Sequence, residues 1–272
     1  MPALDFEALK KSMLAERQNV LSSSLSPPPR TTTTTTNHST APLVQSIEPS
    51  TALNCTAHSP WNFGATGPPL LPLPFPALPH VLYVSNAVST DHETALVAAI
   101  RGAPWVELRA RRLQQWGGLP GPGGMKNTVP LPPFLRTLAD GLVAAGIFPA
   151  GAPPNHALVN AYEVGEGIDA HTDGPCYAPL VATLSLGDDA LMRFRGREPG
   201  APHVGEIVLR ARSMVITSDT LYTDFAHEIE RNEAVTVGGR AEVWNAEDAD
   251  IKKGDIITRS RTRISVTLRH AL

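Results

Sequence analysis

The sequence has little cysteine and no long apolar run. Cysteine occurs only at Cys55 and Cys176, which is too few for a disulfide framework and is typical of a reducing compartment, the cytoplasm or the nucleus. No run of about 18 apolar residues is present, so we expect no membrane-spanning helix. Acidic residues near the amino terminus, Asp5 and Glu7 among them, argue against a secretory signal or a transit peptide.

The chain also lacks an excess of positive charge. Its formal net charge is -3 and its isoelectric point is near 6.3. A surface coated in positive charge for nucleic-acid binding is therefore excluded, and any such binding must use a local basic patch.

Composition divides the 272 residues into three parts. Residues 1–20 carry apolar side chains near helical spacing, which predicts a short amphipathic helix. Residues 21–76 are rich in Ser, Thr and Pro and cannot bury enough apolar surface to offset their ordering entropy, so we expect a disordered linker. Residues 77–272 are expected to form the folded domain, and 42% hydrophobic content is sufficient for its core.

Within that domain, two helices are expected before a series of short strands. Thr90 to Glu93 forms a capping-box pattern that opens a helix through Ile100, and a second helix follows Pro132-Pro133 and stops at Gly146. Turn residues then separate short strand-like segments at 156–164, 168–173, 181–186, 190–195, 206–217, 225–229 and 263–269. This order predicts an α+β, mainly β fold, an antiparallel barrel or jelly roll braced by helices on one side.

A single His-x-Asp occurs in the chain, at His171 and Asp173. Residues two apart in a strand project from the same face, so this imidazole and this carboxylate can point at one metal ion. Two imidazoles and one carboxylate form the ligand set of a facial-triad Fe(II) oxygenase, which leaves coordination positions open for chemistry.

Three downstream histidines are candidates for the third ligand. His203 lies in a Gly- and Pro-rich loop that is too mobile to hold a ligand, and His270 ends the chain on the opposite face of its strand. His227 lies in the strand-like segment 225–229, where a side chain can be fixed. We therefore predict His227 as the third ligand, and an oxidative enzyme as the leading hypothesis.

The segment 263–269 alternates strictly, with Arg263, Ser265, Thr267 and Arg269 on one face and apolar residues on the other. If the apolar face packs against a second layer, both arginines point inward and need anions. Arg263 suits the distal carboxylate of a dicarboxylate co-substrate, with Arg269 near the metal carboxylate. Asn160 and Tyr162 share a face and can add donors. The alternative is a surface strand with solvated arginines.

Four runs carry a resemblance to a known family: "RRLQQWGGLPGPGGM" at 111–125, "LPPFL" at 131–135, "NHALVNAYEVGEGIDAHTDGP" at 155–175 and "RTRISVTLRH" at 261–270. In order and spacing the chain resembles the AlkB-like Fe(II) and 2-oxoglutarate-dependent dioxygenases, most closely the eukaryotic AlkB homologue 6 type. The resemblance covers about residues 75–272. The amino-terminal part lies outside it.

This resemblance implies a double-stranded β-helix, a cupin-like jelly roll, in residues 77–272. It implies Fe(II) held by His171, Asp173 and His227, with 2-oxoglutarate and dioxygen as co-substrates. The residues implied to contact 2-oxoglutarate are Asn160, Tyr162, Arg263, Ser265 and Arg269. Ser265 stands where some relatives carry Asn. The implied reaction is oxidative demethylation of alkylated RNA or DNA bases, with release of succinate, CO2 and formaldehyde.

Contacts to a nucleic-acid substrate are expected from aromatic and basic side chains. Trp116 and Tyr177 are candidates for stacking on a flipped base, beside the local cations Arg109, Arg111, Arg112 and Lys126. The alternative is that Trp116 is a packing residue and the arginines form a solvated edge. A second phosphate track is expected at Arg193, Arg195 and Arg197, and the acidic segment 242–255 is expected to lie away from phosphate.

Two other functions stay open. The same oxygenase chemistry can act on a protein side chain, which the acidic isoelectric point favours. A catalytically silent module that recruits partners through the amino-terminal arm is the third hypothesis, and the intact ligand set argues against it. Zinc can also occupy the same three ligands. We expect a monomer.

Overall fold

The computed structural model describes residues 70–71, 81–121 and 123–272. The predicted helix within residues 1–20 lies outside the described residues, as does the range 21–76 except for one short strand. That strand, β1 (Leu70–Leu71), pairs with β2 (Val81–Val84). No helix in the described part of the chain is long and apolar enough to cross a membrane.

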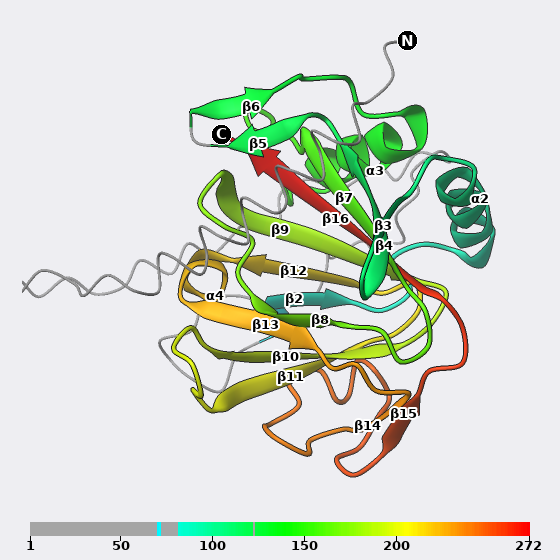
Figure 1. Cartoon of the computed structure of the whole chain (residues 1–272), viewed down its shortest axis with the longest axis vertical. Helices are drawn as coiled ribbons and strands as arrows, with labels where there is room; N and C mark the ends of the chain where they lie inside the picture. Colours follow the sequence, from blue (N-terminus) through cyan, green and yellow to red (C-terminus); the bar gives the residue numbers. More distant parts are fainter. Residues whose placement is uncertain (1–69, 72–80, 122) are drawn as a thin grey trace, which may run out of the picture. The chain divides into compact units, whose positions relative to one another are not determined.

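Two antiparallel sheets form the centre of the fold (Figure 1). The larger has the order β1-β2-β12-β9-β16-β7-β4-β3 and the smaller the order β11-β10-β13-β8. The remaining strands of the larger sheet are β3 (Val106–Leu108), β4 (Arg111–Trp116), β7 (His156–Tyr162), β9 (Tyr177–Leu186), β12 (Met214–Ser218) and β16 (Arg263–Ala271). The smaller sheet comprises β8 (Ile168–His171), β10 (Ala190–Gly196), β11 (His203–Leu209) and β13 (Phe225–Ile229).

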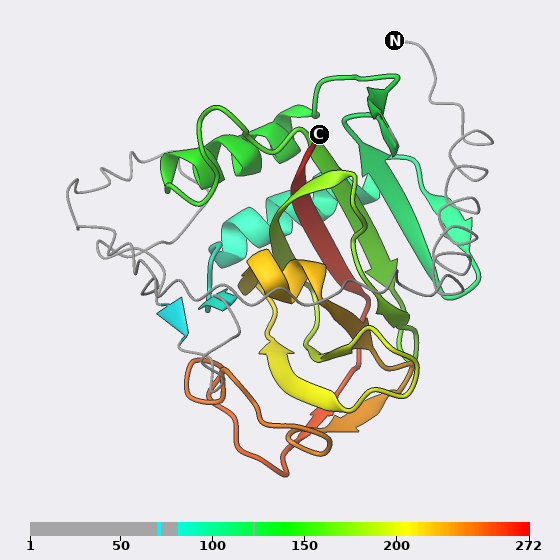
Figure 2. The same ribbon diagram turned by 90° about the vertical axis from the view of Figure 1, so that its left-hand side faces the viewer.

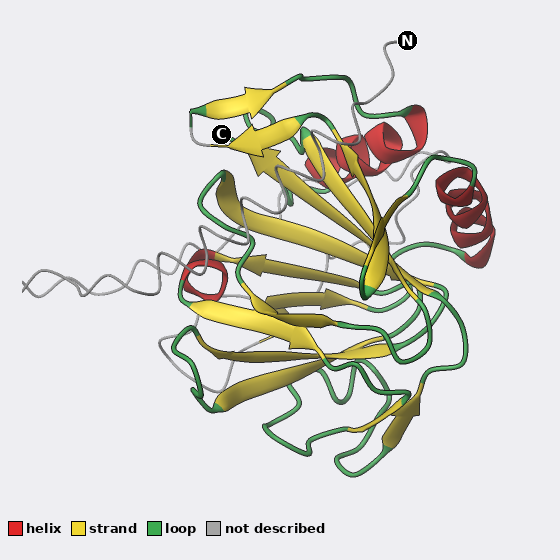
Figure 3. Ribbon diagram, in the orientation of Figure 1, coloured by secondary structure: helices red, strands yellow, loops and turns green. Residues whose placement is uncertain are grey.

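Short hairpins and helices complete the structure. The hairpins are β5 (Leu119–Gly121) with β6 (Gly124–Lys126), and β14 (Ala234–Thr236) with β15 (Ile256–Thr258). The helices are α2 (Thr90–Arg101), α3 (Pro133–Ala144) and α4 (Asp219–Thr223). Strands dominate the described residues (Figure 3), and the predicted mainly β jelly-roll class is confirmed.

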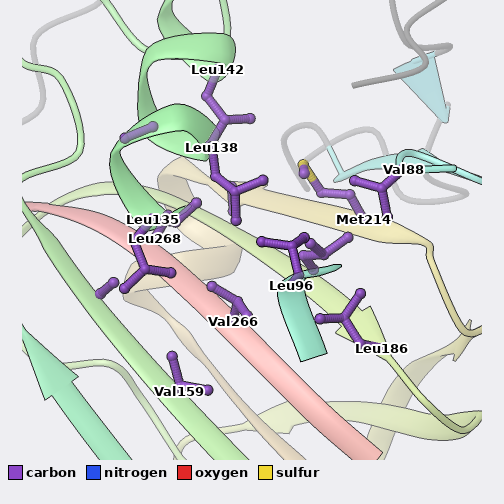
Figure 4. Close-up of a cluster of buried hydrophobic side chains, with 14 of the residues drawn as sticks. Val88, Leu96, Leu135, Leu138, Leu142, Val159, Leu186, Met214, Val266 and Leu268 are labelled. Carbon is purple, nitrogen blue, oxygen red and sulfur yellow. The ribbon is translucent and has the colours of Figure 1, made fainter. Parts of the chain in front are cut away.

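Helices α2 and α3 cover one face of the larger sheet (Figure 2). The apolar residues of β16, Val266 and Leu268 among them, lie in one buried cluster with leucines of α2 and α3 (Figure 4). Burying such side chains stabilises each by about 1.5–3 kcal/mol. The apolar face of β16 therefore meets a second layer, as expected, and the alternative of a surface strand is excluded. Arg263 and Arg269 consequently lie on the opposite face of the strand.

The two helix predictions differ in accuracy. Helix α3 begins at Pro133 and is followed by Gly146, whose φ of +72° suits glycine, as predicted. The predicted capping box at the start of α2 is wrong by one residue, because the cap is Ser89, whose hydroxyl accepts from the backbone N–H of His92 at 3.2 Å. Glu93 instead accepts from the backbone N–H of Gly187 at 2.8 Å.

The single strand expected at 206–217 is also wrong. The chain forms β11 and β12, with a turn between them in which Arg212 has a φ of +66°. Asp189 holds this turn, because its carboxylate accepts from Arg210 Nη1 at 2.6 Å and from the backbone N–H of Ala211 at 2.8 Å. A carboxylate more than twenty residues earlier in the chain therefore holds a turn where the sequence suggested one continuous strand.

Candidate metal centre and anion site

Two histidines from the smaller sheet and one aspartate meet at a single point. His171, the last residue of β8, is the cross-strand partner of His227 on β13, and their ring centroids lie 4.4 Å apart. Possible ligand atoms of His171, Asp173 and His227 all lie within 4.8 Å of one another. The expected convergence of these three side chains is confirmed.

The expected position of Asp173 on the same strand as His171 is wrong. β8 ends at His171, so strand alternation does not orient the carboxylate. A salt bridge does, because Arg269 Nη1 donates to Asp173 Oδ1 at 3.0 Å. This contact between Arg269 and the carboxylate was expected from the sequence.

The His171 ring is oriented for metal binding. Its Nδ1 lies 2.8 Å from the backbone carbonyl oxygen of Asp169. Because a carbonyl oxygen only accepts, Nδ1 must carry the proton, which leaves Nε2 as a free ligand atom. Behind the second imidazole, Phe194 lies 6.2 Å from the His227 ring and stacks on Trp244 at 5.2 Å.

The other two histidines considered as ligands lie away from this cluster. His203 was expected in a mobile loop, and that is wrong, because it begins strand β11. Its Nε2 lies 2.8 Å from Glu228 Oε1, and this glutamate follows His227 on the opposite face of β13. His270 Nδ1 lies 2.7 Å from the carbonyl oxygen of Pro153.

The electrostatics favour a neutral pair of imidazoles beside a carboxylate anion. Burial and the neighbouring His227 lower the pKa of His171 to about 4, and burial lowers the pKa of His227. Burial alone would raise the pKa of Asp173, but the combined influence of Arg269 and of the neighbouring His227, His171 and His156 outweighs burial and holds this pKa below its usual value. Neutral imidazoles and an ionised carboxylate are the protonation states that metal binding requires.

A candidate anion site lies on the inner face of β7 and β16, the face that points away from helices α2 and α3. Arg263 is 1% exposed, and its Nη2 donates to Ser185 Oγ at 2.8 Å. Its Nε has no hydrogen-bond partner among the described residues. Burial lowers the pKa of Arg263 to about 10. A buried guanidinium with an unpartnered donor fits a carboxylate ligand.

Three further residues of the expected anion site lie on the same sheet face as Arg263. Tyr162 is the cross-strand partner of Arg263 and Asn160 that of Ser265, so all four share one face. The guanidinium lies 5.7 Å from the centre of the Tyr162 ring, and burial raises the pKa of this tyrosine. Asn160 and Ser265 are both buried. The structure thus places Asn160, Tyr162, Arg263 and Ser265, four of the residues predicted to contact 2-oxoglutarate, on one sheet face.

Comparisons with known proteins agree with this geometry. The 2OG-Fe(II) oxygenase superfamily profile matches residues 123–269, which is more than half of the chain and includes all three metal-site residues. The chain belongs to the 2OG-Fe(II) oxygenase superfamily. Oxygenases of this superfamily use Fe(II), 2-oxoglutarate and dioxygen, and the His-Asp-His cluster with its neighbouring buried arginine fits that ion and that keto acid.

Individual relatives were found for much of this oxygenase chain. It is 37% identical over 207 residues to the "Probable RNA/DNA demethylase ALKBH6" of Danio rerio, covering 71% of this chain and 86% of the relative. It is 26% identical over 192 residues to the "Uncharacterized protein L905" of Acanthamoeba polyphaga mimivirus, covering 70% of this chain and 83% of the relative. The solved structure of OsALKBH1 gives a TM-score of 0.47 at 17% identity, covering 74% of this chain and 100% of that one.

The side chains of β4 that were expected to contact the substrate project from two different faces of the sheet. Arg112 and Trp116 pair with Ala161 and Ala157 of β7, which face the helices. Trp116 packs edge-on against Phe134 of α3 at 6.2 Å. The structure therefore favours the alternative that Trp116 is a packing residue, on the opposite face of the sheet from the metal cluster.

The neighbouring arginines also differ from each other. Arg112 pairs with Glu163 at 3.0 Å and lies over the Trp105 ring at 5.2 Å. Arg111 projects from the other face of β4, and its Nε donates to Asn160 Oδ1 at 3.0 Å. Arg111 is therefore the basic residue of this pair that faces the oxygenase site. Arg109 and Lys126 are exposed.

The second phosphate track expected on β10 is not supported. Arg193 is buried and forms ion pairs with Glu206 at 2.8 Å and Glu230 at 2.6 Å. Arg195 lies 3.8 Å from Glu228, and Arg197 donates to the carbonyl oxygen of Thr223. These acidic partners lie far away in the sequence, which explains why a local pattern suggested free cations.

Two residues near Arg269 lie in surroundings that the sequence analysis did not predict. Tyr177, expected to stack on a base, is 6% exposed and lies 4.3 Å from the guanidinium of Arg269. His156 was not predicted as a site residue, although it has the same strand parity as Asn160 and Tyr162. That parity is the signal that identifies it, because all three project from one face of β7.

The ligand-free oxygenase is expected to lose stability as the pH falls from about 6.5 toward 4. The folded-state pKa values of His156, His171 and His227 all lie below the usual 6.5, so the unfolded chain takes up protons first. The contribution of these three neutral histidines to the free energy of unfolding is complete above pH 6.5 and decreases on acidification. Urea unfolding with chelator present measures this, and His156→Phe should reduce the slope. Stability that stays constant or rises between pH 7 and pH 5 would contradict the expectation.

Proposed function

We propose that this oxygenase removes methyl groups from alkylated nucleic-acid bases, with His171, Asp173 and His227 holding Fe(II) and Arg263 holding 2-oxoglutarate. The observation that carries the proposal is the His-Asp-His cluster joined through Arg269 to the inner face that carries a buried, partly unpartnered guanidinium. With its co-substrates bound, the iron centre supplies oxidation of a C–H bond coupled to decarboxylation of 2-oxoglutarate to succinate and CO2. A hydroxylated N-methyl group then breaks down to formaldehyde and the demethylated base.

The protein side chains perform distinct tasks in this proposal. His171 offers Nε2 because its Nδ1–H is bound to a backbone carbonyl. Asp173 stays ionised because Arg269 donates to it, and one of its oxygens remains available to the metal. Arg263 places a positive charge in a site closed to water, where its attraction to a carboxylate is stronger than in bulk solvent. Asn160, Tyr162 and Ser265 complete the polar surface around that carboxylate.

Several observations support nucleic acid as the substrate class. The relative from Danio rerio carries the name of a probable RNA/DNA demethylase. Arg111 is half-buried beside the site, and its terminal nitrogens have no hydrogen-bond partner in the described part of the chain. Arg109 and Lys126 add exposed positive charge. A base must be flipped or single-stranded to reach a recessed centre, so single-stranded substrates are preferred.

A protein side chain is the second candidate substrate, favoured by the net charge of -3. We further propose that the chain acts as a monomer in the cytoplasm or nucleus, consistent with its two cysteines. The catalytically silent module is the third hypothesis. A silent module would not use its metal-ligand set for catalysis, so this hypothesis predicts no turnover of 2-oxoglutarate.

Turnover assays separate these hypotheses. Purified protein with Fe(II) and 2-oxoglutarate is offered methylated single-stranded RNA, the corresponding DNA, or methylated-lysine peptides, and succinate and formaldehyde are quantified. We expect the oligonucleotides to stimulate both products. Stimulation by peptides alone would favour the protein substrate, and no turnover by folded, iron-loaded protein would favour the silent module.

Arg111→Gln is expected to weaken oligonucleotide binding and to reduce its salt dependence by about one charge. Arg112→Gln is the matched control, since it removes the same charge from the opposite face of β4. The measurement is the apparent Kd for a methylated single strand at several salt concentrations. Equal effects of the two substitutions would contradict a directional contact by Arg111.

A further inference from the structure

His156 is a buried polar residue without a partner. The side chain is 1% exposed, and neither ring nitrogen has a hydrogen-bond partner among the described residues. Each buried polar atom left without a partner destabilises a fold, whereas an apolar ring of similar size would fill the same space at no such cost. An unpartnered imidazole at this position therefore points to a ligand.

The surroundings of His156 identify the direction of that ligand. His156 is the cross-strand partner of Arg269, and both project from the inner face that also carries Asn160 and Tyr162. The Tyr177 ring lies 5.3 Å from the His156 ring and 4.3 Å from the Arg269 guanidinium. The Tyr177 ring thus packs beside both side chains. Arg269 in turn reaches the carboxylate of Asp173 at 3.0 Å, so His156 lies beside the metal end of the site.

The chemistry of this pair suits an anion. Burial and the positive charge of Arg269 lower the pKa of His156 well below its usual value, so the ring is neutral and offers one N–H donor. A neutral N–H beside a guanidinium is a donor pair for a carboxylate. Because His156 and Arg269 are both almost fully buried, the carboxylate must belong to a small molecule that enters between the sheets.

We propose that His156 is a further 2-oxoglutarate contact, whose ring N–H donates to the carboxylate at the Arg269 end while Arg263 holds the distal carboxylate. The proposal rests on the function and site proposed above. It assigns the two inward arginines to opposite ends of one keto acid. It also gives the otherwise unpartnered imidazole a hydrogen bond in the loaded enzyme.

Binding of 2-oxoglutarate to the full-length protein loaded with Mn(II), measured by calorimetry without oxygen turnover, tests the proposal. His156→Phe keeps the ring and its contact with Tyr177 but removes the donor. We expect the Kd for 2-oxoglutarate to rise at least about tenfold, since a hydrogen bond to a charged group contributes about 1.5–3 kcal/mol and 1.4 kcal/mol is tenfold. Mn(II) affinity without 2-oxoglutarate should not change. His156→Gln, which restores an N–H, should recover part of the affinity.

Thermal unfolding gives a second readout that a merely structural histidine would not produce. The ligand-free His156→Phe protein is expected to have an equal or higher Tm, by up to about 2–4 °C for each kcal/mol gained. Wild-type 2-oxoglutarate affinity in His156→Phe would overturn the proposal. If that variant does not fold, His156→Leu provides the same comparison.

Failure of this inference is distinguishable from failure of the proposed site. If the wild-type protein with Mn(II) binds no 2-oxoglutarate, or if Arg263→Met binds it normally, the proposed site is wrong. If the wild type binds it, Arg263→Met does not and His156→Phe does, only the role of His156 is overturned.

Discussion

Alanine at His171 or His227 is expected to abolish 2-oxoglutarate turnover. Each substitution leaves two ligands where an open octahedral site needs three. Loss of a residue that only supports a ligand already lowers metal affinity by about 10–100-fold, so loss of a ligand should exceed that range. Fe(II)-dependent succinate formation and Mn(II) binding by calorimetry measure the two consequences on the same protein preparations.

His203→Ala is the matched control for this prediction. It removes the same side chain from β11, at the edge of the same sheet, where the imidazole contacts Glu228 rather than the metal cluster. We expect it to retain Mn(II) affinity and turnover. Activity that survives His227→Ala, or that is lost only in His203→Ala, would show that the third ligand is assigned wrongly.

Arg263→Met is expected to raise the Kd for 2-oxoglutarate by at least about 25-fold. Truncating one partner of a buried, hydrogen-bonded charge pair costs about 2–5 kcal/mol, and each 1.4 kcal/mol is tenfold. Arg263 is 1% exposed and its Nε is unpartnered, so the ligand-free protein should not be destabilised by an apolar side chain of similar length. Calorimetry with Mn(II) measures the change in Kd, and urea unfolding of the ligand-free protein measures the change in stability.

Arg261→Met is the control, because Arg261 lies two residues earlier and is exposed. Its backbone N–H donates to Asp188, a contact that the substitution preserves. We expect wild-type affinity for 2-oxoglutarate. A normal Kd in Arg263→Met would mean that the keto acid is anchored elsewhere, whatever the metal site does.

The strands with regular patterns were predictable from sequence. The strict alternation in 263–269 fixed which face of β16 meets the helices, because reversing it would bury two unpaired arginines in the apolar core. His227 was predictable as a ligand because it lies in a short strand, although its pairing with His171 was not. The sequence pattern predicted the direction of the site side chains wherever a strand had one apolar face and one polar face.

The failures have a common physical cause, contacts between residues far apart in the chain. Asp173 is oriented by Arg269, 96 residues later, and not by its own strand. β4 was not predicted, because its sequence places polar residues on both faces: Arg111 toward the site, Arg112 and Gln114 toward the helices. Because β4 was not predicted, the sequence analysis could not show that Arg111 and Arg112 project from opposite faces of one strand.

A crystal structure of the protein with Mn(II) and 2-oxoglutarate, with the metal located by anomalous scattering, measures the site most directly. We expect one Mn(II) ion bonded to His171 Nε2, His227 and Asp173, with the distal carboxylate of the keto acid on Arg263. Mn(II) bound elsewhere, or a keto acid that does not touch Arg263, would contradict the account.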